Sequence, residues 1–241
     1  MSRLYALFRQ LNILFKAFFH LLYPDLCIHC KRELTSKHPY LCYSCTMRLK
    51  LIKWQKKAAY NIVYQSLNPN LVIYICALYK FEESEPIQTL LHELKYRFNR
   101  GLGLHYGKEL GAQYSSEKRN HPIEVLVPVP VHARKKFDRG YNQSELLAKG
   151  ISTTTGIPVS TKVLKKIKNT KTQTQLNKTE RLLNTKGSFS VSEEIMNYKT
   201  IAIVDDVVTT GATINAICQA LMQKNNNLQI TIFSLALAQQ E

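Results

Sequence analysis

The sequence predicts an α/β fold, in which a mostly parallel sheet carries helices on both faces, over residues 71–241. From residue 123 onward, short apolar runs that suit strands alternate with longer stretches of helical spacing. The run at residues 201–204 is apolar throughout, as expected for a strand that helices cover on both faces. With 241 residues the chain can bury a full core, so the fold needs no disulfide.

The pattern along the chain gives the order of the elements. Residues 71–79 are rich in β-branched and aromatic side chains, which favour a strand, and Pro86 suits the first turn of a helix. Gly156 and Pro158 form a turn between a helix and the next strand. We therefore expect strands at residues 71–79, 123–127, 163–167, 200–204 and 229–236, and helices at residues 86–97, 104–114, 142–152 and 213–224.

Residues 1–23 predict an amphipathic helix, because apolar side chains recur at spacings of three and four between residues 4 and 22. In the interpretation that we favour, this helix packs on the rest of the protein. In the alternative, it lies on the inner membrane or on a partner, as basic amphipathic helices do. The sequence shows no signal-peptide cleavage site, and no run reaches the ~18 apolar residues of a membrane span. We therefore expect a cytoplasmic protein, with peripheral membrane contact through residues 4–22 in the alternative interpretation.

Four of the six cysteines form two Cys-x-x-Cys pairs, Cys27 with Cys30 and Cys42 with Cys45. Four sulfur ligands suit a structural Zn²⁺ ion, so residues 24–57 predict a zinc ribbon. Rubredoxin-like iron is a weaker alternative, and two disulfides are weaker still in a reducing compartment. Four thiolates leave no open coordination position, which argues against catalytic zinc.

The chain is strongly basic, with 33 Lys and Arg against 17 Asp and Glu and a net charge of +16. Such an excess favours polyanionic partners, namely nucleic acid, phosphorylated metabolites or an anionic membrane surface. The alternative is a basic surface without a specific partner, and charge alone gives the two interpretations similar weight.

Two adjacent carboxylates, Asp205 and Asp206, follow the buried strand, and a threonine-rich turn comes next. In open α/β sheets, ligands bind at the carboxyl ends of the strands. The carboxylates can accept hydrogen bonds from two ribose hydroxyls, or they can bind a Mg²⁺ ion that those hydroxyls hold. The amides at the start of the next helix can bind a phosphate. An acidic turn before a capped helix, without a ligand, is the weaker alternative. The turn consists of Thr209, Thr210, Gly211, Ala212 and Thr213.

Two basic segments add cationic side chains to the predicted ligand site. A stiff Val-Pro-Val-Pro sequence leads into the first, and a polar, lysine-rich stretch at residues 162–186 forms the second. Both suit pyrophosphate or a DNA backbone, and the second suits a mobile loop that closes over a ligand. An ordinary basic loop and a solvated charge run are the alternatives. The candidate residues are Arg134, Lys135 and Arg139 in the first segment, and Lys165, Lys166, Lys168 and Lys171 in the second.

Residues 203–213 resemble the phosphoribosyl-pyrophosphate (PRPP) motif of type I phosphoribosyltransferases at nearly every position. In that family the acidic pair binds the ribose hydroxyls and the threonine-rich turn binds the 5′-phosphate. The resemblance therefore implies the first role for Asp205 and Asp206 and the second for residues 209–213. It also implies that the predicted sheet is of the type I phosphoribosyltransferase kind.

A wider set of motifs resembles the ComF family of competence-associated proteins. These proteins have an N-terminal zinc ribbon and a C-terminal phosphoribosyltransferase domain, and the resemblance runs from about residue 24 to the end of the chain. One position departs from the pattern, because Lys166 stands where relatives often have an arginine; lysine keeps the charge but loses bidentate phosphate recognition. The motifs are Val-Pro-Val-Pro, Arg134, the Arg-Gly-Tyr-Asn-Gln run at residues 139–143, Thr170, Gln173, Arg181, Asn184, Phe189 and the Asp-Asp loop.

The resemblance implies Zn²⁺ in the ribbon, Mg²⁺ with bound PRPP, and single-stranded DNA and competence or recombination proteins as partners. Two functions are then open. In the one we favour, a PRPP-binding protein acts in DNA uptake during natural transformation by binding single-stranded DNA, with Phe137 and Tyr141 stacking on bases. In the other, an active phosphoribosyltransferase transfers phosphoribosyl from PRPP to an acceptor, for which the sequence has no recognisable motif.

Overall fold

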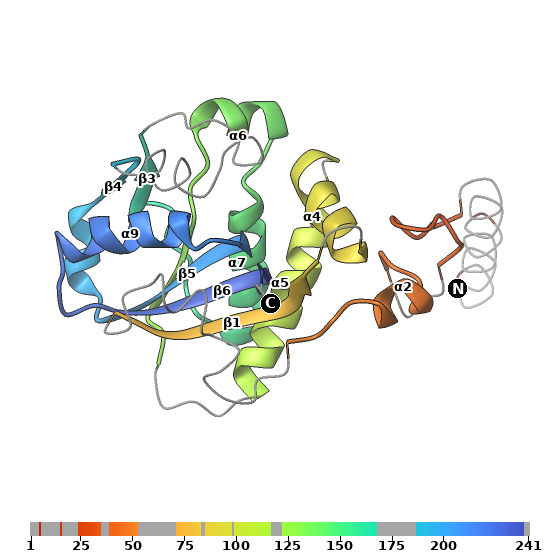
Figure 1. The fold of residues 1–241 in the computed structure, drawn as a ribbon, viewed down its shortest axis with the longest axis horizontal. Helices are drawn as coiled ribbons and strands as arrows, with labels where there is room; N and C mark the ends of the chain where they lie inside the picture. Colours follow the sequence, from red (N-terminus) through yellow and green to blue (C-terminus); the bar gives the residue numbers. More distant parts are fainter. Residues whose placement is uncertain are drawn as a thin grey trace. The chain divides into compact units, whose positions relative to one another are not determined.

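The computed structural model of the chain describes residues 24–34, 39–52, 71–82, 85–97, 99–116, 122–167 and 187–238, together with Tyr5 and Phe15. The chain divides into two compact units, Met1–Leu49 and Lys50–Glu241 (Figure 1). The predicted helix at residues 4–22 lies outside the described residues, apart from Tyr5 and Phe15, which are both helical. None of the helices in the described ranges has the length and apolar character needed to cross a bilayer.

The described part of the first unit consists of two short cysteine-bearing turns. In the first turn, an antiparallel bridge joins Leu26 to Glu33, and the Cys27 amide donates to the Arg32 carbonyl at 2.7 Å. The second turn leads from Cys42 into the short helix α2 (Tyr43–Met47). Each turn therefore presents both of its cysteines from one local structure, as a metal knuckle does.

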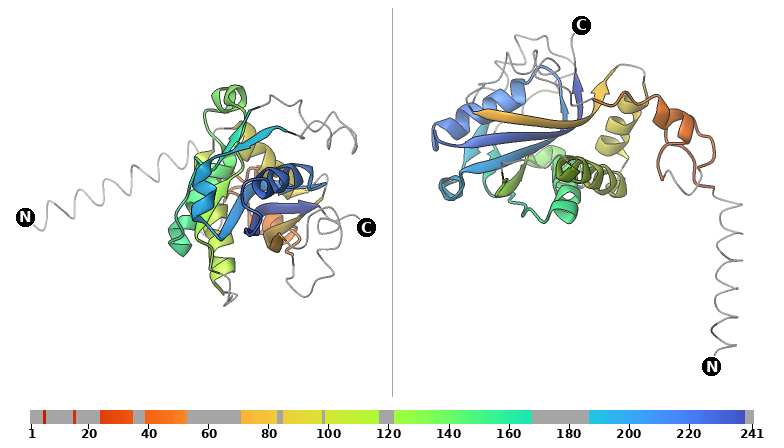
Figure 2. Two further views of the ribbon diagram at one scale, coloured as in Figure 1. Left: turned by 90° about the vertical axis from the view of Figure 1, so that its left-hand side faces the viewer. Right: turned by 90° about the horizontal axis from the view of Figure 1, so that it is seen from below.

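The second unit is built on a four-stranded parallel sheet. Its strands are β1 (Val72–Phe81), β2 (Val125–Pro128), β5 (Thr200–Val208) and β6 (Gln229–Ala238), in the order β1-β6-β5-β2. The strands are almost entirely buried, because helices lie on both faces of the sheet (Figure 2). The mostly parallel sheet that the apolar runs predict is thus confirmed.

Helix α9 (Ala212–Met222) covers one face of the sheet, and α5 (Arg100–Ser116) and α7 (Gln143–Thr155) cover the other (Figure 2). Ile217 and Leu221 of α9 belong to the central apolar cluster. Helix α4 (Pro86–Tyr96) begins at Pro86, as expected. All the parallel strands point the same way, so their carboxyl ends meet at one edge of the sheet, where Asp205 and Asp206 lie.

Four elements differ from the expectation. The basic segment after Val-Pro-Val-Pro forms a helix, α6 (Ala133–Arg139), which the His132 side chain caps and Gly140 ends at a φ of 68°. Strand β3 (Leu164–Lys166) pairs antiparallel with β4 (Phe189–Val191) in a separate small sheet. A 3-10 helix, η3 (Glu193–Asn197), precedes β5. Strand β5 itself continues to Val208 and so contains both aspartates instead of ending before them.

Candidate functional site

The acidic pair lies at the carboxyl end of β5, in the protein interior. Asp205 is 8% exposed and Asp206 is 4% exposed. Burial of two adjacent carboxyl groups is costly unless each is neutralised or hydrogen-bonded. Each side chain has its own partner: Ser144 on α7 contacts Asp205, and Lys95 on α4 contacts Asp206.

Asp205 is held by neutral donors. The Ser144 hydroxyl, at the start of α7, donates to Oδ1 of Asp205 at 3.3 Å, and the Asp206 amide donates to the same oxygen at 2.9 Å. Burial and the neighbouring Asp206 carboxylate raise the pKa of Asp205 to about 8. The surroundings of Asp205 therefore favour its protonated form.

Asp206 is instead held by a cation. The Lys95 ammonium, in the last turn of α4, lies 2.7 Å from Oδ2 of Asp206, and the Lys95 side chain is 24% exposed. Burial alone would raise the pKa of Asp206, but the Lys95 charge outweighs burial and lowers that pKa. Burial alone would likewise lower the pKa of Lys95, and the Asp206 charge raises it instead.

A pocket of about 200 Å³ lies beside the ion pair. Arg139 is well oriented within it, because its guanidinium donates to the Gln143 side chain at 3.1 Å and lies 5.2 Å from the centre of the Tyr96 ring. The pocket also contains one carboxylate, on Asp138. Three cations around such a volume suit an anion carrying more than one charge. The lining residues are Lys95, Tyr96, Lys135, Asp138 and Arg139.

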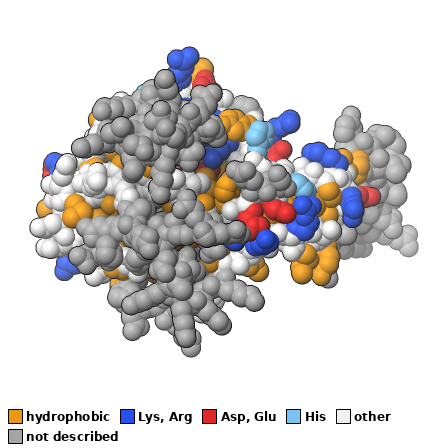
Figure 3. Space-filling model, in the orientation of Figure 1, with side chains coloured by type: hydrophobic (Ala, Val, Ile, Leu, Met, Phe, Trp, Pro, Cys, Tyr) orange, Lys and Arg blue, Asp and Glu red, His pale blue; other side chains and the backbone are white. Residues whose placement is uncertain are grey.

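The basic residues predicted from the sequence divide into two groups. Burial and the charges of Arg139 and Lys95 lower the pKa of Lys135, and burial and the charge of Lys135 lower the pKa of Lys166. These three cations and Lys166 therefore share one region near the acidic pair. Arg134 and Lys165 are exposed instead, and Lys168 and Lys171 lie outside the described residues. In Figure 3, Lys and Arg side chains project from the tip at α6 and appear again in the recess between α6 and α4.

The threonine-rich turn joins β5 to α9, as predicted. Gly211 takes the N-cap position of α9 at a φ of 72°, a conformation that favours glycine. Its carbonyl accepts from the Asn215 amide at 2.8 Å, so the helix starts directly at the turn. Thr209, Thr210 and Thr213 are half-buried at this start. The backbone amides of a helix N-terminus next to two carboxylates can hold a phosphate while the carboxylates accept sugar hydroxyls.

Sequence reasoning missed three residues of the site, Lys95, Tyr96 and Ser144. No motif spacing marks them, because α4 and α7 reach the acidic pair only through the fold. Their one signal is position, since each lies at the end of a predicted helix.

The structure also corrects the predicted role of Tyr141. Tyr141 is 6% exposed, and its hydroxyl donates to the Leu94 carbonyl at 2.7 Å, so its ring cannot stack on a base. Phe137, on α6, is 87% exposed, and its contact with a base stays a prediction.

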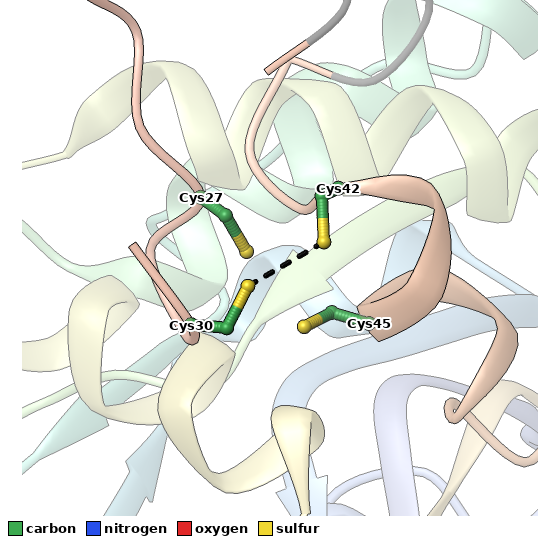
Figure 4. Close-up of side chains that lie close together, drawn as sticks. All are labelled: Cys27, Cys30, Cys42 and Cys45. Carbon is green, nitrogen blue, oxygen red and sulfur yellow. Dashed lines mark hydrogen bonds between the residues drawn. The ribbon is translucent and has the colours of Figure 1, made fainter. Parts of the chain in front are cut away.

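The four paired cysteines gather at one point of the first unit. Their sulfur atoms all lie within 4.8 Å of one another, with 3.5 Å between those of Cys30 and Cys42 (Figure 4). A tetrahedral ion with Zn–S bonds of about 2.3 Å places its sulfurs about 3.8 Å apart, so this set fits such an ion. Burial would raise the pKa of Cys27, but backbone amides of neighbouring residues favour the thiolate and lower that pKa to about 6. All six cysteines are described, and none forms a disulfide. The four cysteines could therefore hold a metal ion.

Comparison with known proteins finds similarity along most of the chain. Competence protein F of Haemophilus influenzae is 29% identical over 228 residues, which cover 88% of this chain and 96% of that protein. DNA utilization protein YhgH of Salmonella typhimurium is 24% identical over 212 residues, with 83% and 92% covered. Competence protein ComFC of Bacillus subtilis is 32% identical over 111 residues, with 46% and 43% covered. No family model matches the chain.

Proposed function

The chain belongs to the ComF family, and from this premise we propose that it binds PRPP at the carboxyl end of its sheet and acts in DNA uptake by binding single-stranded DNA. The names of the relatives, which refer to competence and to DNA utilization, support the general process. The single observation that supports the ligand is the buried acidic pair of β5 beside a pocket of three cations.

Each part of PRPP has a matching part of the site. Asp205 and Asp206 would accept the two ribose hydroxyls, and the turn at residues 209–213 would bind the 5′-phosphate at the start of α9. The pyrophosphate would lie in the pocket of about 200 Å³ against Lys95, Lys135 and Arg139. Mg²⁺ would arrive with PRPP, since its oxygen ligands can come from the pyrophosphate and the sugar.

Calorimetry with PRPP and Mg²⁺ tests the ligand. Wild type should bind, and the double variant Asp205→Asn/Asp206→Asn should lose binding while remaining folded, because each substitution removes the carboxylate charge and replaces one acceptor oxygen by an NH2 donor. Glu124 is a matched control, since this carboxylate accepts from the amides of Lys199 and Thr200 and has no part in the site. Glu124→Gln should keep wild-type affinity. Wild-type affinity in the double variant would contradict the ribose role.

The proposed DNA surface is the outer side of α6 with the neighbouring β3. Phe137 offers an exposed ring on which a base can stack, worth about 1–3 kcal/mol, and Arg134 and Lys165 offer exposed charges for phosphates. Lys136 contributes less, because its ammonium lies 2.8 Å from the Glu145 carboxylate. Affinity should fall steeply with salt, with a slope of about −0.7 per phosphate contact.

Fluorescence anisotropy with a labelled oligonucleotide at several salt concentrations tests the DNA surface. Phe137→Ala should weaken binding without changing the salt slope, because it removes stacking and no charge. Replacing Lys165, Lys166, Lys168 and Lys171 together by Ala should weaken binding and flatten the slope. Met196→Ala, which removes another exposed apolar side chain, is the control and should bind as wild type. No binding by wild type at low salt would remove DNA as a partner.

A transferase activity is the second candidate function. The pocket of cations beside the acidic pair supports it, because a pyrophosphate leaving group needs its negative charge stabilised as the bond to the sugar breaks. Release of pyrophosphate from PRPP, measured with single nucleobases and small amines as acceptors, tests this activity. Release that depends on an acceptor and disappears in Asp205→Asn/Asp206→Asn would establish it, and release at the background rate with every acceptor would reject it for those acceptors.

Structural zinc is our proposal for the ion of the cysteine set, since four thiolates suit Zn²⁺ and leave no open position. Competence or recombination proteins remain proposed partners, as does membrane contact through residues 4–22.

A further inference from the structure

The ion pair between Lys95 and Asp206 occupies two groups that the proposed ligand needs. Asp206 is one of the two acceptors for the sugar hydroxyls, and Lys95 is one of three cations that line the pocket. The Lys95 ammonium lies 2.7 Å from Oδ2 of Asp206, an oxygen that solvent does not reach, so a sugar hydroxyl can bond to this oxygen only when the pair opens. Binding is therefore an exchange of partners.

Opening the ion pair costs free energy when the ligand gives a new partner to only one of the two groups. Asp206 is 4% exposed, so water cannot solvate its charge once Lys95 leaves. Lys95 is also largely buried, with 24% of its side chain exposed. A buried charge without a partner is strongly destabilising, so a ligand that engages only one of the two groups leaves the other unpaired.

Lys95 is placed so that it can change partner without moving its helix. Its side chain lines the pocket while its ammonium contacts Asp206, so a short change of side-chain rotamer brings the charge to an anion in the pocket. The backbone beside it is fixed, because the Tyr141 hydroxyl holds the Leu94 carbonyl at 2.7 Å. The Arg139 side chain is less free to change its position, since its guanidinium contacts both Gln143 and the Tyr96 ring.

We propose that Lys95 is a specificity-determining residue, which makes the site select ligands that carry a sugar diol and an adjacent diphosphate in one molecule. Such a ligand gives Asp206 hydroxyl donors and gives Lys95 a new anion in the same step. A sugar phosphate without the diphosphate leaves Lys95 unpaired, and free diphosphate leaves Asp206 unpaired. This inference rests on the proposed binding of PRPP and adds the rule by which the site rejects its fragments.

Calorimetry of the full chain with three ligands, at one fixed Mg²⁺ concentration, tests the rule. The ligands are PRPP, ribose 5-phosphate and inorganic pyrophosphate. Wild type should bind both fragments weakly, and saturation with one fragment should strengthen binding of the other at least tenfold, because the first has already opened the pair. In Lys95→Met, ribose 5-phosphate should bind at least tenfold more tightly than in wild type, pyrophosphate should bind more weakly, and the mutual strengthening should disappear.

Lys135→Met is the matched control. It removes a second cation from the same pocket and leaves the pair of Lys95 and Asp206 unchanged. Affinity for pyrophosphate and PRPP should fall, affinity for ribose 5-phosphate should stay unchanged, and the mutual strengthening of the fragments should remain. If Lys95→Met only lowers the affinity for all three ligands by a similar factor, Lys95 is an ordinary pyrophosphate contact and the inference is wrong.

A crystal structure of the wild-type protein with PRPP decides the question without a variant, in case Lys95→Met does not fold. The Lys95 ammonium should then lie within hydrogen-bond distance of a diphosphate oxygen and more than 4 Å from Asp206. An intact ion pair beside bound PRPP would overturn the inference but leave the proposed function in place. If wild type binds PRPP in neither experiment, the proposed function fails and the inference falls with it.

Discussion

Asp205 and Asp206 follow one another along β5, and the structure surrounds the two carboxyl groups differently. Neutral donors hold Asp205, whose pKa rises to about 8 through burial and the Asp206 charge. The Lys95 ammonium holds Asp206 and lowers its pKa despite burial. These surroundings favour the neutral form of Asp205 and the charged form of Asp206, a combination that reduces the repulsion between the two groups.

Stability should depend on pH through Asp205. Its pKa is higher in the folded than in the unfolded chain, so its contribution is full below the ordinary pKa near 4 and is lost as pH rises to about 8. Asp205→Asn cannot titrate. Urea denaturation should therefore show that the variant gains free energy of unfolding relative to wild type between pH 5 and 8, by on the order of 1 kcal/mol per pH unit.

Asp206→Asn is the control, because its effect on the free energy of unfolding should depend on pH in the opposite direction. The lowered pKa of Asp206 stabilises the fold above its ordinary pKa, and that contribution is lost as pH falls. Relative to wild type, this variant should therefore be least stable at neutral pH. A constant difference between wild type and Asp205→Asn over the whole range would show that the Asp205 carboxyl is ionised in the folded protein.

Tyr141→Phe should lower both stability and ligand affinity. The lost hydroxyl leaves the buried Leu94 carbonyl without this donor, which costs about 1–3 kcal/mol of unfolding free energy. The same carbonyl precedes Lys95, so the last turn of α4 should become less ordered and PRPP should bind several-fold more weakly. Tyr198→Phe is a control, because its hydroxyl bonds to Glu194 at 3.2 Å, away from the site, and its affinity for PRPP should be unchanged.

At the scale of elements, the close crossing of α5 and α7 positions the site. A Cβ atom at Gly107 would lie 2.3 Å from the Leu147 carbonyl oxygen and 2.9 Å from the Gly150 Cα atom. Only glycine fits such a contact, because both neighbours are backbone atoms that cannot move independently of α7. Helix α7 begins beside Ser144, which bonds to Asp205, so the crossing supports the acidic pair.

Gly107→Ala should push α5 and α7 apart and cost about 1–3 kcal/mol of unfolding free energy. Thermal denaturation measures the loss, and weaker PRPP binding should accompany it. Gly111→Ala on the same helix is a milder control, because the atom nearest to its new Cβ, the Thr154 Cβ, would lie 3.0 Å away, against 2.3 Å for the nearest atom at Gly107. Equal stability losses in the two variants would show that α7 does not resist the displacement.

The central elements could be predicted because local sequence determines them. The apolar runs that form β2, β5 and β6 are buried only in a sheet that helices cover on both faces. Pro86 starts α4 in the first turn, where the backbone amide that proline lacks would have no partner within the helix. The acidic pair and the threonine-rich turn were found for a similar reason, since both follow one strand directly.

The remaining features depend on contacts between distant parts of the chain. The sequence predicts a loop where α6 forms, because this segment is highly charged and has few apolar residues. The helix is stabilised at its two ends instead, by the His132 cap and by the left-handed Gly140. Lys95 and Asp206 are 111 positions apart (206 − 95), so no spacing rule joins them. The pairing of β3 with β4 likewise bridges residues 167–188, most of which lie outside the described residues.

At the scale of the whole molecule, the two compact units imply two separate sources of stability. The described part of the first unit is small and has few buried apolar side chains, so a bound ion should supply much of its folding free energy. The second unit has its own sheet and core. Loss of metal should therefore unfold the first unit and leave the second folded.

Elemental analysis of protein purified without chelator should find one zinc per chain. Cys27→Ser should reduce the zinc content and increase proteolysis near the cysteine turns, while circular dichroism still shows the cooperative melting of the α/β unit. Cys218→Ala, which changes a buried cysteine outside the set, should keep one zinc. A folded, metal-free wild-type preparation, or iron as its only metal, would contradict the assignment.

The order of strands in the sheet has a consequence for how the protein is made. Strand β1 is the first to leave the ribosome, and among the described strands it pairs only with β6, which is the last. Roughly 150 residues separate them, so β1 waits on the order of 10 s for its partner at about 5–20 residues per second. The nascent chain therefore exposes one edge of a long apolar strand until β6 has been made. A stop codon before residue 229 would remove β6 and leave one edge of β1 permanently without its parallel partner, so truncations before this residue should yield aggregated protein.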